Sequence, residues 1–343
     1  MTNAPLVYAI ILNYNGDDYL KTCLTSLELQ TYTNYRIIVY DNASTDNSVD
    51  FMHKNFPNIT LLESKENFGF TKGNNLAIKF ALSQKADYVF LLNNDTAVEK
   101  DLLEKLISTA ESDDSIGIVG PAVFDLKNIR SIQEMGVGVD RFGYPLAIKS
   151  SAEKGLNIFF VSGCAMMIKA RVLRKIGFFD EEYFMFVEDL DLCWRAQLAG
   201  YKIIVNEEAK IYHASGASIS GGVLKSSSYK TNIRRVYLRE KNTLRTLIKN
   251  YDTANMIKFV FFYVGLLFFE SFFWTFILKP TTSKNILKAI FWNIKVLPDT
   301  LKQRSIVQRI RKIKDKDIAE KMINGYCKLS IFRTIGVPHF ENS

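Results

Sequence analysis

The sequence predicts an α/β fold, in which a mostly parallel sheet carries helices on both faces. Over residues 6–110, short apolar runs alternate four times with segments of helical periodicity. The runs are apolar without interruption, as expected of strands that are buried on both faces. Three of the four runs end in Asn or Asp, and ligands of such sheets bind beyond the carboxyl ends of the strands.

Each predicted element follows from its own pattern. Helical segments repeat apolar residues every three or four positions, as Leu20, Leu24 and Leu27 do. The four strands are expected at 6–12, 36–40, 59–62 and 88–92, and their helices at 17–29, 46–55, 71–83 and 99–110. Beyond residue 115 we expect strands at 116–119, 165–168, 201–205 and 210–212, a Gly-rich hairpin within 130–150, and a helix at 188–199 that Gly200 ends.

The charge of the chain is unevenly distributed. Its 343 residues include 44 basic and 36 acidic side chains, a net charge of +8, which by itself would suit a nucleic acid or an anionic membrane as partner. Residues 1–224 carry a net charge of −7, whereas 225–249 and 279–316 carry +7 and +9. We therefore expect an α/β catalytic domain at 1–224, a basic and aromatic helical region at 225–343, and no nucleic-acid partner.

The cysteines and the N-terminus indicate the compartment. Cys23, Cys164, Cys193 and Cys327 lie far apart, so neither a disulfide framework nor a metal finger is expected, and a reducing compartment fits best. The first apolar run, 6–12, has the length of a strand and no basic region before it. We expect no signal peptide and an N-terminal part that folds in the cytosol.

Two strand ends carry groups suited to a polar ligand. Asp41 follows the second strand, where a carboxylate can accept hydrogen bonds from a ribose or a base; a solvated turn is the alternative. Asn93, Asn94 and Asp95 follow the fourth strand, and their oxygens suit a hard divalent cation that also binds phosphates. The alternative here is again a turn, because Asn and Asp favour turns.

The glycine-bearing turn at 67–75 (NFGFTKGNN) enters a helix and suits backbone N–H contact with phosphate. It matches neither G-x-G-x-x-G nor the P-loop pattern, which weakens both the dinucleotide-binding and the P-loop hypotheses.

Acidic residues begin the helix predicted at 188–199. Glu188 and Asp189 lie in its first turn, where the helix dipole favours an ionised carboxylate that could accept a proton from an alcohol. Simple capping of the helix is the alternative. Asp191 and Arg195 are four residues apart and are expected to form a structural salt bridge. His213 ends a later strand and could complete an oxygen-rich metal site, or could be structural.

In their order and spacing, these sequence motifs resemble those of the GT-A fold glycosyltransferases of family 2, in particular the bacterial rhamnosyltransferase-like branch. The resemblance covers roughly residues 6–250. It rests on Asn13-Tyr-Asn, Asp41-Asn-Ala-Ser-Thr-Asp46, the 67–75 turn, Asn93-Asn-Asp95, Glu188-Asp-x-Asp-x-Cys-Trp-Arg195 and His213-x-x-Gly216.

The resemblance implies an inverting, metal-dependent transfer of a sugar from a nucleotide-diphosphate donor to a hydroxyl of a lipid-linked or cell-surface glycan. The donor would be dTDP-rhamnose or a UDP-hexose. Asp95 and His213 would hold Mg²⁺ or Mn²⁺, and Asp189, with Glu188 beside it, would deprotonate the acceptor. Donor binding would fall to Asn13, Asp41, Asn42, Asn67, Lys72, Asn74, Asn93 and Asn94. Because Asn93 replaces the first acid of the family's D-x-D element, metal coordination would be thinner here.

Two other functions are considered. A degenerate, non-catalytic scaffold is disfavoured because Asp41, Asp95, Asp189 and His213 are all present. A nucleotide-dependent dehydrogenase is disfavoured because the glycine fingerprint is missing.

The basic region suggests a membrane partner. Residues 233–249 form an amphipathic pattern with Arg and Lys over much of its polar surface, which suits an anionic membrane surface or, alternatively, packing against the catalytic domain. Residues 259–278 are long enough to span a bilayer and contain one charge, Glu270. Since both flanks are basic, we expect a peripheral or monotopic helix on the cytoplasmic face; a single span and burial in an oligomer are the alternatives.

Overall fold

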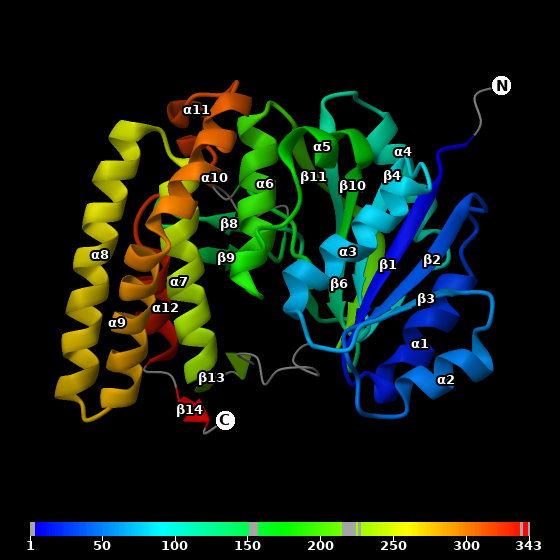
Figure 1. Ribbon diagram of the computed structural model, residues 1–343, viewed down its shortest axis with the longest axis horizontal. Helices are drawn as coiled ribbons and strands as arrows, with labels where there is room; N and C mark the ends of the chain where they lie inside the picture. Colours follow the sequence, from blue (N-terminus) through cyan, green and yellow to red (C-terminus); the bar gives the residue numbers. More distant parts are fainter. Residues whose placement is uncertain (1–3, 151–156, 215–223, 226–227, 337–338, 342–343) are drawn as a thin grey trace.

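The computed structural model describes residues 4–150, 157–214, 224–225, 228–336 and 339–341. Gly216 of the last motif lies outside these residues. A nine-stranded mixed sheet forms the centre of the N-terminal part, in the order β3-β2-β1-β4-β10-β6-β11-β5, with β7 paired to β6 (Figure 1). Its strands are β1 (Val7–Asn13), β2 (Tyr35–Asp41), β3 (Thr60–Glu63), β4 (Tyr88–Asn93), β5 (Thr96–Val98), β6 (Ile116–Asp125), β7 (Ile132–Glu134), β10 (Ala165–Lys169) and β11 (Lys202–His213).

Helices cover both faces of this sheet, which confirms the predicted fold class. Along β1 the side chains alternate: Val7, Ala9 and Ile11 join one buried cluster, and Tyr8 and Ile10 join the other. The first cluster includes α1 (Asp17–Glu28), α2 (Ser48–Asn55) and α4 (Leu102–Glu111). The second includes α3 (Gly69–Ser83), α5 (Ala170–Ile176) and α6 (Glu188–Leu198).

Three predicted elements, a helix and two strands, differ clearly from the structure. The helix expected from residue 99 begins at Leu102, because residues 96–98 pair with β11 as β5. The two strands expected at 201–205 and 210–212 are a single strand, β11, whose register against β6 shifts between Asn206 and Lys210. The expected hairpin is present as β8 (Val137–Val139) and β9 (Pro145–Ala147).

The C-terminal part is helical and packs against the side of the sheet that carries α6 (Figure 1). Its elements are α7 (Ile233–Asn250), α8 (Thr253–Phe276), α9 (Pro280–Lys295), α10 (Leu297–Ile310), α11 (Asp315–Ala319) and α12 (Cys327–Ile335), with β12 (Leu224–Lys225), β13 (Ser228–Asn232) and β14 (His339–Glu341) in a small sheet. One hydrophobic cluster continues through both parts: Trp194 of α6 packs edge-on to Tyr251, which stacks on Phe259 of α8.

The prediction that the basic residues of 233–249 form a surface is wrong for three of them. Lys241, Arg245 and Lys249 are buried, and α7 packs against α6, α9 and α10. The alternative stated above, a helix packed on the catalytic domain, describes α7. The amphipathic pattern could not distinguish the two cases because it does not show where the compensating anions lie.

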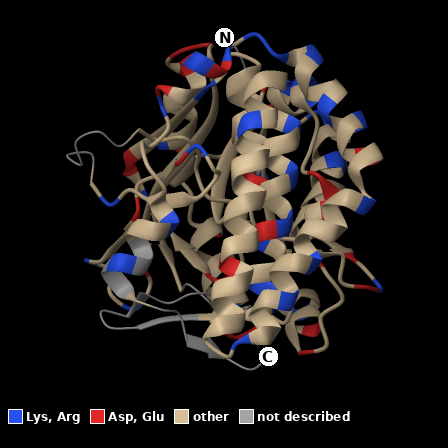
Figure 2. Cartoon of the chain, turned by 90° about the vertical axis from the view of Figure 1, so that its left-hand side faces the viewer, with Lys and Arg blue, Asp and Glu red and all other residues tan. Residues whose placement is uncertain are grey.

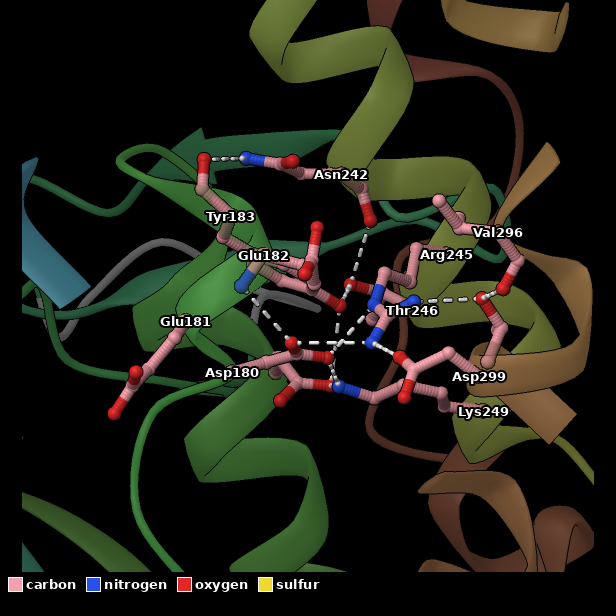
Figure 3. Close-up of polar contacts among 12 residues, drawn as sticks. Asp180, Glu181, Glu182, Tyr183, Asn242, Arg245, Thr246, Lys249, Val296 and Asp299 are labelled. Atoms are coloured by element: carbon pink, nitrogen blue, oxygen red, sulfur yellow. Dashed lines mark hydrogen bonds and ion pairs between the residues drawn. The ribbon is translucent and has the colours of Figure 1, made fainter. Parts of the chain in front are cut away.

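Those anions come from the segment before α6 and from α6 itself (Figure 3). Asp180 accepts from Arg245 Nε at 2.8 Å and from Lys249 Nζ at 2.6 Å. Asp191 contacts Lys249 Nζ at 3.1 Å and, as predicted, forms a salt bridge with Arg195 at 2.9 Å. Burial alone would raise the pKa of Asp180, but the charges of Lys249 and Arg245 hold that pKa well below its usual range.

Candidate active site

A hydrogen-bonded cluster joins the carboxyl ends of β1, β2 and β4. Asn13 Nδ2 donates to Asp41 Oδ1 at 2.9 Å, to Ser44 Oγ at 3.1 Å and to Ser48 Oγ at 2.9 Å. Asn13 Oδ1 accepts from Asn94 Nδ2 at 2.8 Å. The sheet topology therefore brings together three of the residues that the sequence assigned to donor binding.

Asp41 lies at the expected edge of the sheet and is buried. Its carboxylate also accepts from Ser44, at 2.9 Å from the backbone nitrogen and 2.6 Å from the hydroxyl. These bonds organise the loop after β2. Contact of Asp41 with a nucleoside stays a prediction.

Asn42 connects this edge to the glycine-bearing turn. Its Nδ2 donates to Asn67 Oδ1 at 2.9 Å and to the Gly69 carbonyl at 3.1 Å, and its Oδ1 accepts from Phe68 N at 2.8 Å. Gly69 has a φ of 74°, and a Cβ there would lie 2.5 Å from the Phe184 ring. Only glycine suits that position, where the turn approaches the loop that precedes α6.

The other two candidates in this turn contact nearby groups of the same segment. Lys72 Nζ lies 3.4 Å from the centre of the Phe68 ring, a cation–π contact. Asn74 is buried and donates to the Phe70 carbonyl one helical turn earlier at 2.9 Å. Asn75, which the sequence left without a role, binds the segment before α6 through Phe179.

The two predicted metal ligands face each other. His213 pairs with Thr96 across β11 and β5, and this places His213 Nε2 3.2 Å from Asp95 Oδ1. Asp95 Oδ1 is buried without a hydrogen bond in the described structure. Burying a carboxylate oxygen without a hydrogen-bond donor is energetically unfavourable, and such an oxygen is a ready ligand for a cation.

Gln133 orients the histidine. Its Nε2 donates to the His213 carbonyl at 2.8 Å, which leaves its Oε1 as the acceptor for His213 Nδ1 at 3.2 Å. With Nδ1 bound to Gln133, the other ring nitrogen, Nε2, is the one that faces Asp95. The pair fits a divalent cation. Because no third acidic, His or Cys side chain joins the pair among the described residues, phosphates of the donor would complete the ligand set.

The two acids at the start of α6 lie in different environments. Asp189 is partly exposed and accepts from Gly163 N at 3.1 Å and Leu190 N at 2.8 Å. Glu188 is buried, and its Oε2 has no hydrogen-bond partner in the described structure.

These environments separate the pKa values of the pair. Burial, with the charge of Asp189 added, raises the pKa of Glu188 well above its usual range. Burial raises the pKa of Asp189 too, but backbone hydrogen bonds from Gly163 and Leu190 oppose that rise. Glu188 therefore retains the proton of the pair, and Asp189 is the ionised group that can accept one.

Residues 162–164 connect Asn93, at the end of β4, to Asp189. The Cys164 carbonyl accepts from Asn93 N at 2.9 Å, and the next residue back, Gly163, donates to Asp189. Burial raises the pKa of the Cys164 thiol well above its usual range, and the charges of Glu134, Asp95 and Asp189 add to the rise. The acids Asp95 of the β4–β5 turn, Glu134 of β7 and Asp189 of α6 thus lie around this segment.

Sequence reasoning missed three members of this site: Gln133, Glu134 and Gly163. Burial raises the pKa of Glu134, with hydrogen bonds from Ser162 opposing and the Asp189 charge adding to the rise. The stretch around residues 130–150 shows only hairpin signals in the sequence. The pairing of β7 with the preceding strand β6 brings Gln133 and Glu134 to the site, but the contact of Gln133 with His213 joins residues 80 apart in the chain, which no local pattern encodes.

Comparison with known proteins identifies the family to which this arrangement belongs. Residues 8–177 match the family model described as "Glycosyl transferase family 2". The chain belongs to glycosyltransferase family 2. Its rhamnosyltransferase-like character is supported by two relatives: an N-acetylglucosaminyl-diphospho-decaprenol L-rhamnosyltransferase of Mycobacterium tuberculosis, 24% identical over 60% of this chain and 74% of that protein, and Rhamnosyltransferase WbbL of Escherichia coli, 25% identical over 58% and 79%.

Other similarities extend the comparison. A low-salt glycan biosynthesis hexosyltransferase of Haloferax volcanii is 24% identical over 55% of this glycosyltransferase, which spans 60% of that relative's length. The crystal structure of S. aureus TarS residues 1–349 with UDP superposes with a TM-score of 0.53 at 17% identity, covering 92% of this chain and 89% of the other. A mannosyltransferase from Pyrobaculum calidifontis with GDP-Man and Mn²⁺ also gives 0.53, over 90% and 86%. At these identities the structures establish the GT-A fold alone.

Proposed function

We propose that this family 2 glycosyltransferase transfers a sugar, with inversion, from a nucleotide-diphosphate donor to a hydroxyl of a lipid-linked or cell-surface glycan. The observation that carries the proposal is the link through residues 162–164, which joins Asn93, whose side chain adjoins the Asp95–His213 pair, to Asp189. One side of this segment suits a cation with a diphosphate, and the other side holds a base.

In this proposal Asp189 accepts the proton of the acceptor hydroxyl, which sharpens the attacking oxygen. Its partial exposure lets an acceptor reach it, whereas Glu188 is buried. The protonated Glu188 limits the negative charge beside Asp189. Two N–H donors keep Asp189 ionised and hold its orientation.

Asp95 and His213 would hold Mg²⁺ or Mn²⁺. When bound there, the cation would neutralise charge on the departing diphosphate. Two solved structures of similar fold contain Mn²⁺, which supports a divalent cation here without choosing between the two metals.

The relatives suggest the substrates. Two are named as rhamnosyltransferases, and one of these names includes a diphospho-decaprenol carrier. We therefore place dTDP-rhamnose first as donor and a polyprenyl-linked glycan as acceptor. A UDP-hexose is the second candidate, because another relative is named as a hexosyltransferase and a structure of similar fold binds UDP-GlcNAc.

The test is a donor panel. Purified full-length protein is offered dTDP-rhamnose, UDP-glucose, UDP-GlcNAc and GDP-mannose with Mn²⁺, and nucleotide release is measured with and without a polyprenyl-linked acceptor. We expect acceptor-dependent release from one donor, loss of at least about 10²-fold in EDTA, and a similar loss in Asp95→Asn. Equal turnover in EDTA contradicts the metal assignment, and no release from any donor contradicts the substrate class.

The outer face of α8 supports membrane association. Within the described parts of the chain, α8 is the one helix long and apolar enough to cross a membrane. Its inner face, which includes Tyr263, Leu267 and Trp274, is buried against the protein. Seven phenylalanines of α8 are exposed: Phe261, Phe262, Phe268, Phe269, Phe272, Phe273 and Phe276. Phe261 is 74% exposed and Phe276 78%. Exposed apolar side chains gathered along one helix are typical of a surface that contacts a membrane or another protein.

A buried charge cluster attaches α8 to its neighbours. Lys328, just inside α12, contacts Glu270 of α8 at 2.6 Å and Glu240 of α7 at 2.9 Å. Burial alone would lower the pKa of Lys328, but the charges of Glu240 and Glu270 raise that pKa well above its usual range. Moving α8 across a bilayer would break these buried pairs, at a cost of about 3–5 kcal/mol.

These features favour a helix that lies in the membrane surface over one that spans it. Figure 2 looks onto this face: the helices toward the viewer are mostly uncharged, and Lys and Arg gather along the right-hand side. Exposed lysines of α9 and α10, such as Lys284, Lys288 and Lys302, would meet anionic headgroups. We propose a monotopic protein on the cytoplasmic face, with the outer face of α8 in the acyl boundary.

Replacing part of this face should reduce membrane binding. For Phe268→Ser/Phe269→Ser/Phe272→Ser we expect sedimentation with phosphatidylglycerol vesicles to fall at least about tenfold, because each buried Phe contributes about 1.5–3 kcal/mol. Leu29→Ser/Ile129→Ser, two equally exposed apolar residues of the catalytic domain, is the matched control and should bind as wild type. Unchanged binding of the triple variant would exclude this face as the anchor.

A further inference from the structure

The loop that leads into α6 has an unfavourable backbone conformation. Phe184, Phe186 and Val187 have φ angles of 63°, 68° and 73°. In this region the Cβ atom of a non-glycine residue crowds the following carbonyl, so the conformation persists only where surrounding contacts hold it. Val187 directly precedes α6. The loop therefore sets the direction in which the Glu188–Asp189 turn begins.

Asn242 of α7 supplies such contacts. Its Nδ2 lies 3.1 Å from the Tyr183 carbonyl oxygen, 2.9 Å from that of Met185 and 2.7 Å from that of Phe186. Figure 3 shows the amide reaching Tyr183 from α7. Asn242 is fully buried. The two hydrogens of this amide are thus shared among three backbone carbonyl oxygens of the loop, which lie close together.

The opposite side of the loop contacts α3, the helix of the glycine-bearing turn. Thr71 N donates to the Phe184 carbonyl at 3.1 Å. The ring of Phe184 closely approaches Gly69. The loop is thus held between α3, whose N-terminal turn is a candidate donor site, and α7, through Asn242.

We propose that Asn242 is a positioning residue for Asp189: its amide holds the left-handed loop 184–187 and thereby fixes the start of α6. The inference rests on the proposed function, in which Asp189 is the base. A neutral amide suits this task because it donates to several carbonyls without bringing a charge into the interior. Loss of the clamp should therefore lower kcat through misplacement of the base, and should leave donor affinity nearly unchanged.

The test compares Asn242→Ala with Asn293→Ala. Asn293 is also buried and also donates to two carbonyls at 2.9 Å, those of Lys241 and Ala289, but it does not contact the loop. Both variants should lose similar thermal stability. We expect kcat of Asn242→Ala to fall by about 10²-fold, with the donor KM within about threefold of wild type, because small misplacements of a catalytic group have effects of this size. Asn293→Ala should keep kcat within about threefold.

A rescue variant separates positioning from general stability. Glycine adopts a φ near 73° without steric cost, so Val187→Gly in the Asn242→Ala background should recover at least about a tenth of the wild-type kcat. Equal kcat losses in the two alanine variants, or failure of Asn242→Ala alone to fold, would overturn the proposal.

A second measurement does not depend on the reaction. Backbone amides within 183–190 should exchange with deuterium at least about tenfold faster in Asn242→Ala than in wild type or Asn293→Ala, with no donor present. Unchanged exchange would refute the clamp itself. If exchange rises but Asp189→Asn keeps full activity, the clamp is correct and the assignment of Asp189 as base is wrong.

Discussion

Asp189→Asn is expected to lower kcat for sugar transfer by about 10³-fold with little change in donor KM, because general-base catalysis contributes on the order of 10²–10⁴-fold. The variant keeps the size of the side chain. Gly163 N and Leu190 N bind different oxygens of Asp189, so the one amide oxygen of Asn retains a single one of these two bonds. Single-turnover transfer from the donor identified by the panel, measured alongside donor binding, gives both quantities.

The matched control is the neighbouring acid. Glu188→Gln removes a carboxyl that is buried and whose raised pKa keeps it protonated, so its loss should cost no more than about tenfold in kcat. A larger effect at Glu188 than at Asp189 would reverse the assignment of the base. Since the pKa of Asp189 is raised, the acid limb of the wild-type pH profile should lie above the ordinary aspartate value of 3.8, with activity rising as pH increases through it.

Asp180→Asn is expected to destabilise the fold by about 3–5 kcal/mol, because it leaves two buried cations without their shared anion. Arg245 and Lys249 are both buried, and Asp180 is within 2.8 Å of each. Urea unfolding followed by circular dichroism measures the change.

Asp299→Asn is the matched control, since Asp299 also contacts Arg245, at 2.6 Å, but is 48% exposed. Its loss should cost less than about 1 kcal/mol. Because the folded-state pKa of Asp180 lies below the ordinary value of 3.8, its stabilisation is complete above that pH and is lost as pH falls through the folded-state pKa. Equal costs for the two variants would show that burial does not decide the strength of these pairs.

Local patterns predicted most of the α/β fold. Uninterrupted apolar runs such as 6–12 and 88–92 form central strands, because a strand that is buried on both faces has apolar residues at nearly every position. They also placed Asn13, Asp41 and Asp95 correctly at one edge, because the carboxyl ends of parallel strands share an edge. What they could not predict was the partner of each side chain.

The residues that sequence reasoning missed depend on distant contacts. Gln133 contacts His213 across 80 residues of the chain. Arg245 and Lys249 resembled surface residues because their anion, Asp180, lies far away in the chain. Asn242 gives no pattern at all, since its role depends on three carbonyls of a turn whose φ angles sequence does not reveal.

The contacts between α6 and α7 have a consequence for biosynthesis. The chain leaves the ribosome from its N-terminus, so Asp180, Asp191 and the loop before α6 are made before the α7 residues that bind them. Until α7 emerges, the loop before Asp189 lacks the contacts of Asn242, and Asp180 lacks Arg245 and Lys249. The aromatic face of α8 is translated immediately afterwards. Completion of the active site and the first opportunity to meet the membrane therefore fall at nearly the same moment of synthesis.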